Sequence, residues 1–262
     1  MKRLLLFIFF CMLISLNAYE MDMLVDAPTA GILQRGEASL FTEFYKDNGM
    51  LVGMRLGLFP RFVVGMSYGA ENVVGNQKPD WHDRVEFQGK FRLLDESYSI
   101  PALAIGFDSQ GHGRFYIEDN DGNELRRYDI KSKGFYLVAS KNFEFIGNLG
   151  THLGCNYSLE NTDDSRHLNI FAGVDKMIGD VLVATVEYDM GLNDNSDWLE
   201  STLEENFDNL EKGYLNAGMG IYFSSNFLLQ LKFNDLLQNR SDTQAADRSL
   251  NLRYYFDYRD DN

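Results

Sequence analysis

The sequence predicts an all-β protein, a transmembrane antiparallel β-barrel of about twelve strands of the outer-membrane type. Apolar and polar residues alternate with period two along most of the chain, and the alternating segments are about ten residues long. The connections between them are alternately short and long, as in outer-membrane barrels. The chain has 262 residues, with 14% aromatic residues and only 4 prolines, which favours an ordered, strand-rich fold.

The N-terminus has the pattern of a secretory signal. Lys2 and Arg3 precede an apolar run over residues 4–16, and Ala18 offers a small-residue cleavage site. The 13 residues of this run are short for a membrane helix, which needs about 20. We therefore expect residues 1–18 to be a signal peptide, which leaves Cys155 as the single cysteine of the mature chain and excludes an internal disulfide.

The net charge excludes some partners. It is −15 for the whole chain and becomes −17 when Lys2 and Arg3 are removed with the signal. Nucleic acids and anionic membrane surfaces attract basic patches, so we expect neither as a partner. No later segment has 18 consecutive apolar residues, so a membrane-spanning form must be a closed barrel in contact with outer-membrane lipid.

The strands follow from the alternation. In the last one, Leu250, Leu252 and Tyr254 face one way, while Asn251 and Arg253 face the other. The same reasoning predicts twelve strands near residues 37–46, 50–59, 61–70, 83–94, 100–108, 133–142, 145–157, 167–176, 180–191, 213–223, 226–235 and 247–258.

The connections predict the orientation. Every second turn is short, as at 142–144 and 177–179, whereas the others are long and polar, as at 109–132 and 192–212. Short periplasmic turns and long external loops are typical of outer-membrane barrels. The first hairpin, at residues 46–49, is tight where a long loop is expected.

A soluble β-sandwich or lipocalin-like barrel is the competing fold. Its interior would have to hold the Leu, Phe and Tyr side chains of every strand, which is more apolar volume than a small barrel encloses. The opposite faces carry Gly, Ser, Asn and charged residues, which suits a polar lumen. We therefore expect residues 37–262 to form the transmembrane barrel and residues 19–36 to be a periplasmic segment or a plug folded inward.

Several segments along the chain resemble a known family. They are residues 26–30 (DAPTA), 57–62 (GLFPRF), 90–94 (KFRLL), 101–108 (PALAIGFD) and 136–141 (YLVASK). Their order and spacing over residues 26–143 resemble the YjbH-like outer-membrane barrel proteins. The resemblance implies an outer-membrane barrel associated with exopolysaccharide production or export, and it carries no catalytic residue to this chain.

The stretch IPALAIGFDSQGHG, residues 100–113, has the glycine spacing of a phosphate-binding loop. Such a loop needs a lysine and a following helix, but residues 114–117 and 125–130 predict a β-hairpin that projects outward. We expect Ala102, Ala104 and Gly106 to face the lumen, opposite the long side chains of the strand at 83–94.

Other candidate sites are weaker. Residues 118–124 have the composition of a calcium loop without its spacing, and residues 193–211 combine acidic residues with apolar ones at helical spacing. The four histidines lie apart, so we expect no metal site and no cofactor. His152 and Ser158 give little support for a hydrolase, so we expect no enzyme and assign no catalytic residue.

The inward faces of the strands give the candidate functional residues. The lumen-lining candidates are Glu43, Arg55, Arg84, Glu86, Lys90, Arg92, Asp108, Glu187, Asp189, Lys232 and Arg253, joined by His152 and Asp175. Basic residues gather on the second and fourth strands and acidic ones on the ninth. This predicts either a transverse field across a water-filled pore or an interior filled by ion pairs.

Three functions are compatible with such a barrel. The first is exopolysaccharide export or cell-surface assembly, with polysaccharide or export components as partners. The second is a small passive channel for polar solutes, and the third is a structural or adhesive surface protein. The sequence leaves the ligand and the oligomeric state open.

Overall fold

The computed structural model describes residues 21–118, 122–144, 147–162, 165–179, 181–194, 212–239 and 246–258. The predicted signal peptide at 1–18 and most of the acidic segment at 193–211, with its apolar residues at helical spacing, lie outside these residues. Among the described residues, no helix has the length and apolar character needed to cross a bilayer.

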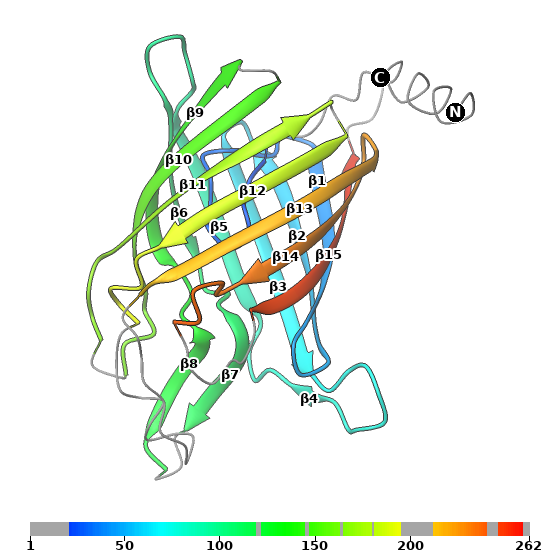
Figure 1. Cartoon of the computed structure of the whole chain (residues 1–262), viewed down its shortest axis with the longest axis vertical. Helices are drawn as coiled ribbons and strands as arrows, with labels where there is room; N and C mark the ends of the chain where they lie inside the picture. Colours follow the sequence, from blue (N-terminus) through cyan, green and yellow to red (C-terminus); the bar gives the residue numbers. More distant parts are fainter. Residues whose placement is uncertain are drawn as a thin grey trace.

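Twelve antiparallel strands form a closed barrel (Figure 1). They are β1 (Glu37–Tyr45), β2 (Gly49–Phe59), β3 (Phe62–Glu71), β5 (Glu86–Leu94), β6 (Ala102–Asp108), β9 (Gly134–Glu144), β10 (Asn148–Tyr157), β11 (Asn169–Ile178), β12 (Leu182–Asp189), β13 (Tyr214–Ser224), β14 (Phe227–Asn234) and β15 (Asp247–Asp257). Each pairs with its neighbour along the chain, and β1 pairs with β15 from Glu37↔Asp257 to Phe44↔Leu250, which closes the ring. The predicted barrel is therefore confirmed, with strand ends within about three residues of those expected.

The short turns gather at one end of the barrel and the long loops at the other. In Figure 1 the turn end is uppermost, and the loops extend below the strands. Three smaller strands lie at the loop end. They are β4 (Asp80–Trp81), which pairs with β3, and β7 (His112–Glu118) and β8 (Glu124–Ile130), which form a separate hairpin.

The alternation in sequence becomes a polar inside and an apolar outside. On β6, Ala102 and Ala104 are buried in the barrel, whereas Ile105, the residue after Ala104, is 43% exposed on the outside. On β15, Arg253 is buried and its neighbour Tyr254 is 49% exposed. An exposed apolar exterior is costly in water and favourable in lipid, so this surface faces the membrane.

Aromatic side chains mark the turn end of this exterior. Phe59 and Phe62 stack with centroids 6.4 Å apart at the β2–β3 turn, and Phe223 lies 5.9 Å from Phe227 at the β13–β14 turn. Phe59 and Phe223 are 62% and 64% exposed. Rings at this position suit the boundary between lipid and water.

The small side chains of residues 102–106 have a different neighbour from the one expected. They face the lumen, but Ala102 and Ala104 pack with Leu24, Ala27 and Ala30 in one apolar cluster. Gly106 lies beside Tyr136, whose ring would be 2.3 Å from an added Cβ atom. The side chains are small here because residues of the protein's own N-terminal part and Tyr136 fill the space next to them.

Candidate functional site: the barrel lumen

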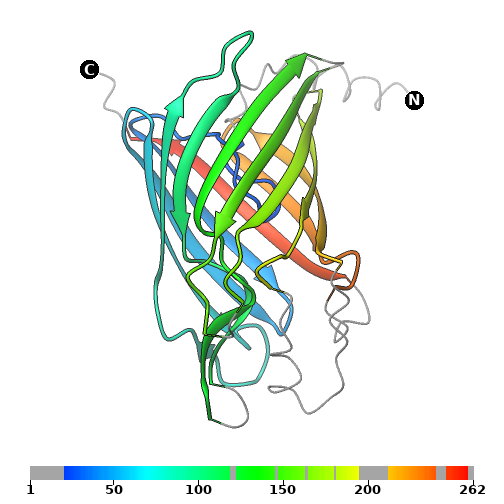
Figure 2. The ribbon, with the colours of Figure 1, turned by 90° about the vertical axis from the view of Figure 1, so that its left-hand side faces the viewer.

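Residues 21–36, called the N-terminal segment here, lie inside the barrel. Figure 2 shows this dark blue trace within the ring of strands, toward the turn end. Leu24, Val25, Ala27, Ala30 and Leu33 are each at most 1% exposed. Gly36, with φ of 91°, donates its N–H to Gly57 O and accepts from the N–H of Tyr258, so the chain leaves the lumen at the rim between β2 and β15.

The acidic side of the wall binds the backbone of the N-terminal segment. The carboxylate of Glu187 on β12 accepts the N–H groups of Val25, Asp26 and Ala27, each at 2.9 Å, and the amide of Asn216 at 2.8 Å. Glu187 is 1% exposed. Four donors around one buried carboxylate satisfy nearly all of its lone pairs, which offsets the cost of removing it from water.

The basic side of the wall binds the carbonyls and a carboxylate of the same segment. Lys90 Nζ donates to Asp22 O at 2.7 Å and to Gly31 O at 3.0 Å. The Arg92 guanidinium donates twice to Ala30 O, at 2.9 and 2.6 Å. The segment therefore presents its donors to one wall and its acceptors to the other.

The side chain of Asp22 joins two arginines from opposite ends of the barrel sequence. One carboxylate oxygen accepts from Arg55 on β2, and the other accepts from Arg253 on β15 at 2.7 Å. All three side chains are at most 8% exposed. Charge-assisted hydrogen bonds of this kind are roughly twice as strong as neutral ones.

One aromatic ring lies close to both arginines. Phe41 on β1 lies between β2 and β15, and its ring centroid is 5.4 Å from Arg55 Cζ and 5.5 Å from Arg253 Cζ. Arg55 Nε also donates to Gln88 at 2.7 Å. The wall itself therefore orients both guanidinium groups.

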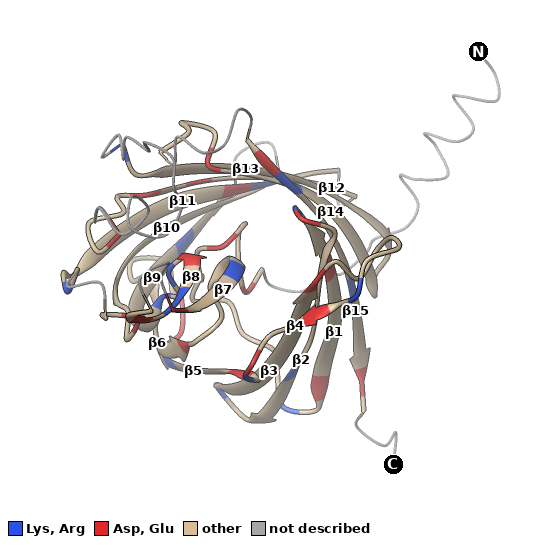
Figure 3. Ribbon diagram, turned by 90° about the horizontal axis from the view of Figure 1, so that it is seen from below, with Lys and Arg blue, Asp and Glu red and all other residues tan. Residues whose placement is uncertain are grey.

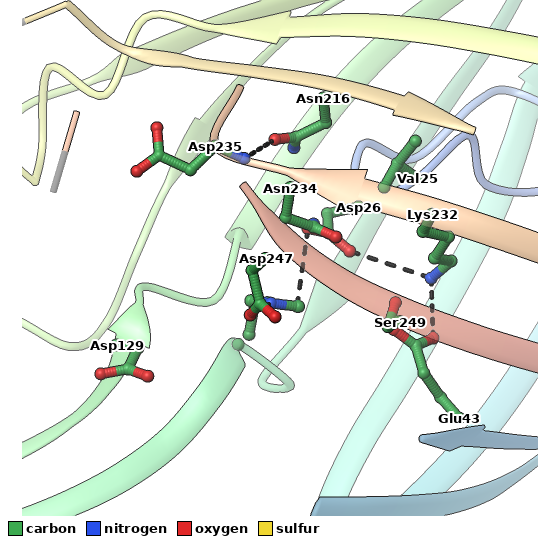
Figure 4. Close-up of polar contacts among 12 residues, drawn as sticks. Val25, Asp26, Glu43, Asp129, Asn216, Lys232, Asn234, Asp235, Asp247 and Ser249 are labelled. Atoms are coloured by element: carbon green, nitrogen blue, oxygen red, sulfur yellow. Dashed lines mark hydrogen bonds and ion pairs between the residues drawn. The ribbon is translucent and has the colours of Figure 1, made fainter. Parts of the chain in front are cut away.

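A second carboxylate of the N-terminal segment points toward β14. Asp26 accepts from the Asn234 amide and lies 3.9 Å from Lys232 Nζ, which donates to Glu43 at 2.7 Å (Figure 4). Ser249 and Asn251 on β15 donate to the same Glu43 carboxylate at 2.8 and 2.9 Å. This network fixes Lys232 and Glu43 as a buried pair.

A hydrogen-bonded chain on β9, β10 and β11 positions another contact. Ser140 Oγ accepts the N–H of Ala30 at 2.8 Å and lies 2.7 Å from His152 Nδ1, while His152 Nε2 lies 2.7 Å from Asp175. The partner of His152 is thus Ser140, whereas the sequence pointed to Ser158. Because Ser140 contacts the N-terminal segment, these three hydrogen-bonded side chains form part of the wall surface that binds the segment.

Ten of the eleven lumen-lining candidates are buried in the barrel, and one is not. Arg84 precedes β5, and its half-exposed side chain pairs with Glu86 and lies over Phe115, 4.5 Å from the centroid. The strand begins at Glu86, three residues later than expected, so Arg84 belongs to the loop end. Asp189 pairs with Lys133, and Glu86 accepts from Tyr128 at 2.8 Å.

Sequence reasoning missed the partners that the N-terminal segment supplies. Asp22 and Asp26 lie in a stretch without periodicity, so no pattern could indicate which wall residues they meet. The alternation could have identified three further wall residues, because they occupy inward positions of the predicted strands. They are Gln88, Ser140 and Asn234.

The base of the β7–β8 hairpin closes over the loop end of the lumen. In Figure 3, which views the barrel from that end, the hairpin lies within the ring of strands. Arg127 and Tyr128 are 0% exposed, and Arg127 pairs with Asp194 beyond β12. The expected hairpin is present as β7 and β8, and its inner half is in addition bound across the mouth.

His112, at the start of β7, ties this hairpin to the wall and to the N-terminal segment. Its Nε2 lies 2.9 Å from Asp247 at the start of β15, and its Nδ1 lies 3.8 Å from Asp26. Burial lowers the pKa of His112, but the carboxylates of Asp26 and Asp247 outweigh it and raise the pKa to about 9.

Two cavities flank the N-terminal segment. One, of about 20 Å³, lies toward the turn end, and Ile32, Leu33 and Val63 are among the residues that line it. The other, of about 70 Å³, lies toward the loop end and is bordered by Glu43, Lys133, Lys232 and Arg253. Met23, Arg55, Gln88 and Asp108 line both, so these four residues form the partition.

Comparisons with known proteins agree with the fold. No protein-family model matches the sequence, and no curated protein matches it. Among solved structures, the chain is similar to a KdgM porin, with a TM-score of 0.50 and 11% identity over 84% of this chain and 99% of that one. A structure described as KdgM porin in complex with disordered oligogalacturonate gives a TM-score of 0.51 and 10% identity over the same shares. The chain thus has the fold of a bacterial outer-membrane porin, a closed barrel of twelve antiparallel strands.

Proposed function

We propose that the protein is a passive outer-membrane channel for polar solutes whose lumen is narrowed by its own N-terminal segment. The observation that carries this proposal is the partition between the two cavities. Only Met23 of the segment and the side chains of Arg55, Gln88 and Asp108 line both sides of it.

The lining supports polar solutes. The inward wall carries buried charged residues on β1, β2, β5, β6, β12, β14 and β15, whereas the outward wall is apolar. A charged lining of this kind interacts with water and hydroxylated solutes and disfavours apolar ones. The proposed mechanism is binding and diffusion, without covalent chemistry.

The N-terminal segment acts in this proposal as a plug. Polar contacts with β2, β5, β9, β12, β14 and β15 hold it, and none of these contacts is covalent. Because hydrogen bonds and ion pairs exchange with water, the segment can leave the lumen when they are weakened. Its exit would join the two cavities.

An exopolysaccharide role rests on the resemblance of residues 26–143 to YjbH-like proteins. That resemblance concerns short segments, among them DAPTA, which forms part of the N-terminal segment, and PALAIGFD, which packs against it. A neighbour of the same fold is described with oligogalacturonate, so acidic oligosaccharides are the first polymers to test. A structural or adhesive role is the outcome if the barrel passes no solute.

Liposome swelling tests the proposal. Vesicles with the mature protein should swell in arabinose, and vesicles with a variant lacking residues 22–33 should swell faster and also admit raffinose. Heat-modifiable migration in detergent gels would verify that the shortened barrel is folded. If neither protein admits arabinose, the channel proposal is wrong and the structural role is favoured.

A further inference from the structure

We propose that Arg55, Arg253, Lys90 and Phe41 form a binding site for the carboxylate group of a solute, and that Asp22 occupies this site as an internal substitute. The four residues are called the carboxylate clamp here. The inference deepens the proposed channel by naming the chemistry of the solute.

The clamp is built to hold an anion. Arg55 and Arg253 approach the two oxygens of one carboxylate from different strands, and Lys90 lies close enough to donate to the Asp22 carbonyl at 2.7 Å. Each of these cations is at most 9% exposed as a residue. Three buried cations around residue 22 need a counter-charge, because an unpaired buried charge costs several kcal/mol.

The clamp is ordered by the wall and not by Asp22. Phe41 lies against both guanidinium groups, at 5.4 and 5.5 Å, and Gln88 accepts from Arg55 Nε at 2.7 Å. None of these contacts involves the N-terminal segment. A site that keeps its geometry without its occupant binds a replacement with little ordering cost.

The clamp also opens toward free space. Arg55 and Arg253 line the cavity of about 70 Å³ at the loop end, which departure of the N-terminal segment would enlarge. Among the described residues, Arg253 Nε and Asn251 Oδ1 lack a hydrogen-bond partner, and both residues line this cavity. Both atoms are covered while the N-terminal segment is in place; once it moves, this donor and this acceptor would suit the hydroxyl groups next to a sugar carboxylate.

Glucuronate and glucose provide a matched pair of probes, because they differ in one carboxylate. In calorimetric titrations of the detergent-solubilised mature protein carrying D22N, we expect glucuronate to bind at least ten-fold more tightly than glucose. Wild-type protein should bind glucuronate about ten-fold more weakly than D22N, because Asp22 competes for the clamp.

Variants of the clamp should remove this preference. Adding R253Q to D22N should lower glucuronate affinity to that of glucose, and R253K should give an intermediate value because lysine keeps the charge without the planar fork. The control is R61Q in D22N, because Arg61 forms a similar pair with Asp95 that is about half exposed on a turn. That change should leave glucuronate binding unaltered.

The outcomes separate this inference from the proposed function. Equal affinity of folded D22N for glucuronate and glucose would overturn the clamp, whatever the barrel conducts. Equal binding of inorganic phosphate and glucuronate would overturn its assignment to carboxylates. Glucuronate binding by a barrel that passes no solute would support the clamp and contradict the channel.

Discussion

The ring of Phe41 on β1 lies against the backbone of Gly53 on β2, where an added Cβ atom would come within 2.3 Å of the ring. The same ring lies 5.4 Å from Arg55 Cζ and 5.5 Å from Arg253 Cζ. A residue without a side chain is needed at position 53 for the clamp to have this shape.

Replacing Gly53 with alanine should therefore destabilise the barrel by about 1–3 kcal/mol, because the ring must move in a packed interior. The measurement is urea unfolding of the refolded barrel, followed by tryptophan fluorescence. Gly89 is the matched control, because nothing lies within 4 Å of a Cβ atom added there on β5. Similar losses for both alanine variants would show that Phe41 yields freely.

Replacing Glu187 with glutamine should release the N-terminal segment. The carboxylate accepts three backbone N–H groups, and an amide offers one fewer acceptor and no charge. A loss of about 1.5–3 kcal/mol is expected for hydrogen bonds to a charged group. Hydrogen exchange at Val25 and Ala27 should accelerate about ten- to a hundred-fold, whereas exposed Glu144 replaced by glutamine should leave it unchanged.

The contact between the β7–β8 hairpin and β15 should weaken at alkaline pH. The pKa of His112 is raised from 6.5 to about 9, so its stabilising contribution is complete below pH 6.5 and is lost as the pH rises through 9. Stability in urea should fall by about 2–3 kcal/mol between pH 7 and pH 10. H112Q should lack this step, and an identical pH profile in H112Q would exclude His112 as its source.

Charged substitutions on the outer surface of the barrel should destabilise it by an amount that depends on their depth in the membrane. Ile105 is 43% exposed near the middle of β6. Its replacement by lysine should lower the free energy of unfolding in a lipid bilayer by about 2–4 kcal/mol. Leu94, 49% exposed at the turn end of β5, should cost at most about 1 kcal/mol for the same change. Unfolding of both variants in vesicles distinguishes them, and equal costs would mean that Ile105 does not face lipid.

The strands could be predicted because a barrel wall imposes period two on each segment. Arg253 and Tyr254 fall on opposite faces for this reason, and Ala104 and Ile105 do so as well. The tight first hairpin at residues 46–48 and the order of turns and loops were also readable, because loop length shows directly in the sequence.

The interior was not predictable to the same depth. The N-terminal segment contacts residues far away in the sequence, as Asp22 contacts Arg253. The local alternation of polar and apolar residues does not indicate such partners. The inner half of the β7–β8 hairpin is held by residues such as Asp194 and Glu160, which lie in two other loops. Arg84 followed the alternation of β5 but falls before the strand begins.

Single-channel recording in planar bilayers tests most directly whether the N-terminal segment narrows a conducting barrel. The protein comprising residues 19–262 should show small openings, and the variant that also lacks residues 22–33 should show openings several-fold larger, because the two cavities then join. Equal conductance, or a closed barrel in both proteins, would contradict this account.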